Sequence, residues 1–142
     1  MRVKLFSVLL GLLTVLATVL VLERTVKAAV IPATGLTGGA AVITDRDGKL
    51  VTETSTLSKW SDYTVKYDWS VRDGQPIAAG DTATVDLPAG TVAPVDLSFP
   101  LKNDNGRVVG IFTIKAGETS GEITFNDTLA QTGTNRAGTL QF

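Results

Sequence analysis

The sequence predicts an all-β fold, an antiparallel β-sandwich, and three observations support this prediction. Residues 63–71 alternate strictly between apolar and polar side chains, which is the period of a strand with one buried face and one solvent-facing face. Turn-forming residues recur at short intervals after this segment. No stretch beyond Leu22 has the apolar period of a helix. A series of roughly six or seven such short strands is typical of an immunoglobulin-like sandwich.

The segment 63–71 is the central strand of this prediction. Its aromatic and β-branched residues suit a half-buried sheet surface, and we expect Tyr67 and Trp69 to point inward. Lys66 belongs to the opposite, polar set. Trp60 is an odd number of positions away from Tyr67 and Trp69. In the alternation of a strand its side chain would therefore point to the opposite, solvent-facing side, and we expect its ring to be exposed.

Further strands are expected on both sides of this segment. Pro94 and Pro100 restrict their region to an edge strand or a kink, because proline has no backbone N–H. Asn105-Gly106 predicts a hairpin turn, because both residues tolerate positive φ. The expected strand regions are 41–43, 82–87, 92–101, 108–114, 123–125 and 138–142. The chain stops inside the last of these regions, and we therefore expect the domain to be truncated at its C-terminus.

The N-terminal residues 1–28 have the pattern of a secretory signal peptide. Arg2 and Lys4 precede an uncharged apolar run from Leu5 to Leu22, and small residues follow at Ala28. We expect a hydrophobic signal helix there, with an uncleaved membrane anchor as the alternative. Either alternative places the globular part outside the cytoplasm, as a secreted or cell-surface protein. Residues 29–58 are expected to form a linker and the first short strand, and residues 59–142 the folded domain.

The composition excludes several classes of function. The chain has no Cys and no His, so disulfides, the usual zinc ligands and the commonest general base are absent. Four bases and one acid lie before Ala29, which leaves nine bases and thirteen acids for the rest, and this acidic balance argues against nucleic-acid binding. Asp45-Arg46-Asp47-Gly48 resembles the start of a calcium loop, but Thr56 stands where the bidentate Glu belongs, which favours a turn. We expect no enzyme activity, cofactor or metal.

Several pieces in residues 61–142 resemble the first immunoglobulin-like subdomain of Gram-positive, wall-anchored adhesins of the collagen-binding type. They are Thr64-Val65-Lys66-Tyr67, Ile77 with Gly80-Asp81, Val85 to Pro88, Val109-Gly110, Ile123 to Asp127 and Gly138 to Phe142. The resemblance implies a module of a secreted cell-wall adhesin. Its partners would be a host extracellular-matrix protein such as collagen and a second subdomain, which this chain lacks, and it would meet the membrane only through its N-terminal segment. In that family a latch strand adds to the sheet of the first subdomain.

The same resemblance suggests two sets of site residues. Related domains can contain a Lys–Asn isopeptide bond promoted by a buried acid, and Lys66, Asp81 and Asn126 have the required chain order, with Asp86 as the alternative acid and Asn135 as the alternative amide. Lys66 alternates with the polar residues of its strand, which are expected to face solvent. This position favours a solvated lysine over a buried isopeptide bond. Trp60 is the candidate for ligand contact. A non-binding structural stalk or pilus module is the alternative function for the same fold.

Overall fold

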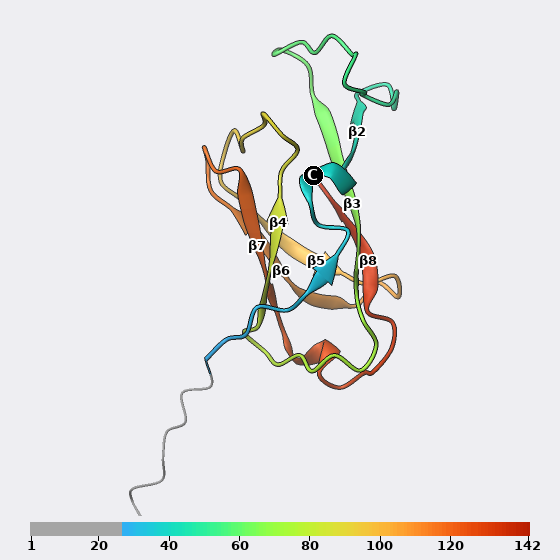
Figure 1. The fold of residues 1–142 in the computed structure, drawn as a ribbon, viewed down its shortest axis with the longest axis vertical. Coiled ribbons are helices and arrows are strands. Elements are labelled where there is room, and N and C mark those ends of the chain that lie inside the picture. The colour runs from blue at the N-terminus through green and yellow to red at the C-terminus, as the bar shows by residue number, and fades with distance from the viewer. Residues whose placement is uncertain (1–26) are drawn as a thin grey trace, which may run out of the picture.

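A computed structural model describes residues 27–142, which form two antiparallel four-stranded sheets packed face to face (Figure 1). This architecture confirms the predicted antiparallel sandwich. The predicted signal helix lies in residues 1–26, outside the described residues. Within residues 27–142, no helix has the length and apolar character needed to cross a bilayer.

The first sheet is built around β3 (Tyr63–Val71), the predicted central strand. β1 (Ala33–Thr34) and β2 (Val42–Asp45) pair with one side of β3, and β8 (Ala137–Gln141) pairs with the other. The register places Tyr67 opposite Leu140 and Trp69 opposite Gly138. Tyr67 and Trp69 are fully buried, as their parity predicts.

The second sheet has the strand order β4, β7, β6, β5. These strands are β4 (Thr82–Asp86), β5 (Leu97–Lys102), β6 (Val108–Ile114) and β7 (Ser120–Phe125). β5 is an edge strand and contains Pro100, in agreement with the restriction on proline. β5 begins only at Leu97, whereas we expected the strand region to begin at Val92. Val92 and Val95 are exposed on the connection around Pro94, where proline provides no N–H for a ladder.

The core lies between the two sheets. The aromatic ring of Phe142 stacks on Phe112 with 5.3 Å between ring centroids and lies 6.2 Å from Tyr67. Rings at this separation add to the stabilisation from apolar burial alone. The largest fully buried side chains are Trp69, Tyr67, Phe112, Phe125, Leu101, Ile123, Leu129, Leu140, Val85 and Val109.

The segment 29–36 differs from the linker that we expected there. Ile31 and Leu36 are buried in the core, and the Ile31 N–H donates to the Thr82 carbonyl at 2.7 Å. The chain lies beside β4 at Val30 and then joins the other sheet as β1, with Pro32 between the two sheets. Pro32 and Gly35 mark this crossing from one sheet to the other rather than a flexible spacer.

Candidate functional site

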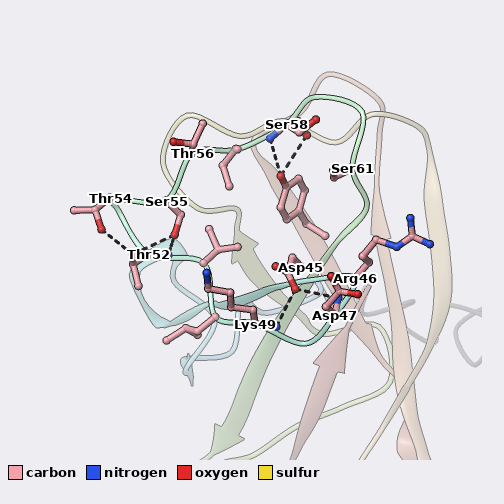
Figure 2. A pocket seen from close by; sticks show the side chains of 14 residues that line it. Asp45, Arg46, Asp47, Lys49, Thr52, Thr54, Ser55, Thr56, Ser58 and Ser61 are labelled. Atoms are coloured by element: carbon pink, nitrogen blue, oxygen red, sulfur yellow. Dashed lines mark hydrogen bonds between the residues drawn. The ribbon is translucent and has the colours of Figure 1, made fainter.

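The connection between β2 and β3, residues 46–62, projects beyond the sandwich at the top of Figure 1. It surrounds an open hollow of about 680 Å³ whose lining is rich in hydroxyl groups (Figure 2). Two acids and two bases, Asp45, Asp47, Arg46 and Lys49, also line it. These formal charges cancel, so the hollow offers hydrogen bonds rather than a net charge.

Hydrogen bonds at both ends of this connection hold it in place. The Asp45 carboxylate accepts the backbone N–H of Asp47 at 3.0 Å and of Lys49 at 2.9 Å. The Tyr63 hydroxyl accepts the Ser58 N–H at 2.8 Å. Asp45 therefore stabilises the predicted turn. In the part of the chain that the structure describes, no group of three Asp or Glu side chains is placed to hold a metal ion.

Trp60 lies on the same connection with 86 % of its surface exposed. This exposure agrees with its parity relative to β3. The Lys59 ammonium lies 4.9 Å from the centroid of the Trp60 ring, which is within cation–π distance. The indole is therefore a large apolar surface in water beside a positive charge, and its role in ligand contact stays a prediction.

The structure gives each of the three isopeptide candidates a different partner. Lys66 lies on the solvent face of β3, and its ammonium is 3.1 Å from the Asp68 carboxylate. The hydrogen bond from Lys66 lowers the pKa of that carboxyl. Asp81 accepts the N–H of Ala29 and of Ala78, both at 2.8 Å. Asn126 donates to the Val108 carbonyl at 2.9 Å and caps the short 3₁₀ helix η2 (Asp127–Leu129).

Two buried charged side chains, Asp81 and Arg136, were not singled out as structural anchors from the sequence. The Arg136 guanidinium is buried and donates to the carbonyls of Gln75, Leu129 and Thr132. Asp81 is buried where the segment 29–36 joins β4. Each residue bonds to backbone groups nearby in the chain and to one that is distant, Ala29 for Asp81 and Gln75 for Arg136. Because all these partners are backbone groups, no pattern of side chains in the sequence distinguishes either residue from a solvated charge.

The family model described as "Bacterial Ig domain" matches residues 56–142. The chain belongs to the bacterial Ig domain family. No curated protein and no solved structure matches it. Domains of this family are typically non-enzymatic and commonly extracellular. The match begins within the connection 46–62, so β1 and β2 precede it although both pair with β3.

An apolar groove of about 210 Å³ lies beside the hollow of this bacterial Ig domain. Tyr63 lines both the groove and the hollow. The groove is also lined by Val65, Leu87, Val92, Pro94, Leu97 and Phe142. We refer to the connection 46–62, including Trp60, together with this groove as the distal face. It combines hydroxyl groups, exposed aromatic surface and an apolar groove, a combination that is typical of ligand-binding sites.

Proposed function

We propose that this bacterial Ig domain is an adhesion module of a bacterial surface protein and that it contributes to binding an extracellular-matrix protein such as collagen. The single observation that supports this proposal is the continuity of the distal face through Tyr63, which joins a polar hollow to an apolar groove. The sequence resemblance to collagen-binding adhesins supplies the class of ligand.

The chemistry of the distal face suits an extended, proline-rich polypeptide. Collagen chains have a polyproline-type backbone with glycine at every third position, and their carbonyl groups are available as acceptors. Proline-rich segments bind in grooves lined by aromatic side chains. Tyr63 and Phe142 line the groove, and the hydroxyls of the hollow supply donors. A second subdomain would complete the binding surface, as the resemblance implies, so we expect weak binding by this chain alone.

Solid-phase binding to collagen, with fibrinogen and fibronectin in parallel, tests this function. The chain is measured alone and joined to a second subdomain of its own gene. We expect Trp60→Ala to weaken collagen binding about tenfold, because truncation of a large interface aromatic commonly costs more than ~1 kcal/mol. Ile111→Ala is the matched control, since Ile111 is exposed on β6 in the other sheet. Absence of binding to all three proteins by the joined form would contradict the proposal.

A non-binding stalk or pilus module is the second candidate, and one observation favours it. In Figure 1 the chain enters the sandwich at the lower end, and Phe142 lies toward the upper end. Domains with this arrangement can follow one another in a row. Unchanged surface attachment after removal of the whole distal connection would favour the stalk.

A further inference from the structure

Three of the four sheet edges in this domain are protected. The outer edge of β4 is covered by the segment 29–36, where the Asp86 N–H donates to the Leu36 carbonyl at 2.9 Å. The outer edge of β2 is covered by residues 49–51, where the Val51 N–H donates to the Ile43 carbonyl at 2.8 Å. β5 contains Pro100 and an irregular register at Leu101/Lys102, both of which hinder an added strand.

Among residues 27–142, no segment protects the edge of β8 in this way over most of its length. Val65 and Phe142 exchange both backbone hydrogen bonds, at 2.8 and 3.1 Å. Because hydrogen-bonded and non-hydrogen-bonded pairs alternate along an antiparallel ladder, this pair determines which residues of β8 bond to β3. The N–H and C=O groups of Thr139 and Gln141 therefore point away from β3. Within residues 27–142, β8 pairs with β3 alone. At the start of β8, the Ala137 carbonyl accepts the Asp104 N–H, so the open part of the edge begins after Ala137.

We propose that the open edge of β8 is a self-association surface, which pairs with the same edge of a second copy of this chain. The two β8 strands lie antiparallel across a twofold axis at Leu140. Thr139 of each copy is then opposite Gln141 of the other, and each opposed pair exchanges two backbone hydrogen bonds. The first sheets of the two copies become one continuous sheet. This inference does not depend on the proposed ligand.

The side chains of the edge favour a second copy as its partner. Residues 137–141 contain no charged side chain, so two identical edges meet without like-charge repulsion. Thr139 and Gln141 are exposed, and Gly138 and Leu140 are buried in their own core, so pairing needs no rearrangement of the core. An interface between two identical patches closes after two copies, which limits the assembly to a dimer.

Disulfide cross-linking tests this pairing in the full chain, which contains no native Cys. Thr139→Cys and Gln141→Cys proteins are mixed in detergent solution and oxidised. We expect the mixed dimer to form about tenfold faster than either homodimer, because pairing raises the effective concentration of the two opposed thiols. Thr113→Cys is the control, because Thr113 is exposed on β6 away from β8. Detergent micelles and the N-terminal segment affect all of these proteins equally.

Thr139→Pro gives an independent measurement by sedimentation. The Thr139 N–H does not bond to β3, so proline removes the open donor and keeps the internal ladder. We expect the dimer fraction to fall with Thr139→Pro and to persist with Thr139→Ala, while the near-ultraviolet dichroism of both matches the parent chain. A mixed cross-linking rate no higher than that of Thr113→Cys would overturn the proposal, even if a foreign peptide bound to β8. Collagen binding is measured separately, so failure of the dimer leaves the adhesion proposal standing.

Discussion

At the scale of single residues, Arg136 is the least expected feature of the domain. Its buried guanidinium donates to the Leu129 carbonyl at 2.7 Å and to the Thr132 carbonyl at 2.8 Å, and also to Gln75. The planar group with five donors satisfies several loop carbonyls at once, which a lysine ammonium cannot reproduce with the same geometry. The side chain therefore ties together two loops that are far apart in sequence.

Arg136→Ala should lower the free energy of unfolding by about 3 kcal/mol, because it leaves buried carbonyls without donors. Arg136→Lys should restore only part of this loss. Urea denaturation measures both changes. Arg107→Ala is the control, since Arg107 is exposed. This substitution should lower the free energy of unfolding by less than about 0.5 kcal/mol. Equal midpoints for Arg136→Ala and Arg107→Ala would show that the guanidinium contributes no stability.

Tyr67 predicts how stability depends on alkaline pH. Burial, and then the nearby Asp86 charge, raise the pKa of Tyr67 to about 12 from its ordinary value of 10.0. The folded state therefore holds this proton more tightly than the unfolded state does. The resulting stabilisation is complete below pH 10.0 and is lost as the pH rises toward about 12.

The comparison with Tyr67→Phe isolates this effect. The variant lacks the hydroxyl that donates to the Asp86 carbonyl at 2.8 Å, so it should be about 1 kcal/mol less stable at neutral pH. As the pH rises from 10.0 toward about 12, the free energy of unfolding of the variant should also fall by about 2 kcal/mol less than that of the parent chain. Denaturation titrations measure both differences, with Tyr63→Phe as the control. Parallel stability curves for Tyr67→Phe and the parent chain would contradict the assignment.

At the scale of elements, the close packing of β8 against the end of β5 depends on Gly138. A Cβ atom at this position would lie 2.5 Å from the Lys102 carbonyl oxygen and 2.9 Å from the Asn103 Cα. Both contacts are with backbone, which cannot move aside as a flexible side chain can. Gly138 thus allows the hairpin end of β5 to approach β8.

Gly138→Ala should therefore destabilise the domain by about 2 kcal/mol through overpacking. Gly133→Ala is the matched control, because a Cβ there meets no atom within 4 Å. Thermal unfolding of the two variants provides the measurement. A melting temperature for Gly138→Ala as high as that of Gly133→Ala would show that the hairpin end of β5 moves aside without a loss of stability.

The alternation of residues 63–71 was sufficient to predict β3 and its buried face, because one strand period determines which side chains point inward. Trp60 was predicted to be exposed for the same reason. Arg136 and Gly138 could not be predicted in this way, since Gln75, to which Arg136 donates, and the end of β5, which Gly138 contacts, are brought near only by the tertiary fold. The hollow formed by residues 46–62 was also beyond sequence patterns, because it depends on the path of an irregular connection.

At the scale of the whole molecule, the segment 29–36 joins the two sheets. The prediction of a linker was wrong in this segment because Pro32 and Gly35 are equally common in spacers and in sharp changes of direction. Ala29 is held by the Asp81 carboxylate at 2.8 Å, and Ile31 and Leu36 enter the core. The first sheet and the edge of β4 therefore depend on residues that precede the family match at residue 56.

Asp81→Ala should release this segment from β4. Two hydrogen bonds to a buried carboxylate are lost, so unfolding should become easier by about 3 kcal/mol. Hydrogen exchange should accelerate most at the Ile31 amide, which bonds to the Thr82 carbonyl, and least at amides of β6. Asp104→Ala is the control, since Asp104 is exposed. Uniform acceleration of hydrogen exchange throughout the domain would indicate that the segment 29–36 opens only when the whole domain unfolds.

The two tryptophans of the chain lie in opposite environments, since Trp60 is almost fully in water and Trp69 is fully buried. Their emission should separate into a red-shifted component that acrylamide quenches and a blue-shifted component that it does not reach. Removal of the Trp60 indole would leave a chain whose intrinsic fluorescence reports on the interior alone. The wild-type spectrum therefore contains, without any added dye, one optical signal for events at the surface and a second for the integrity of the interior.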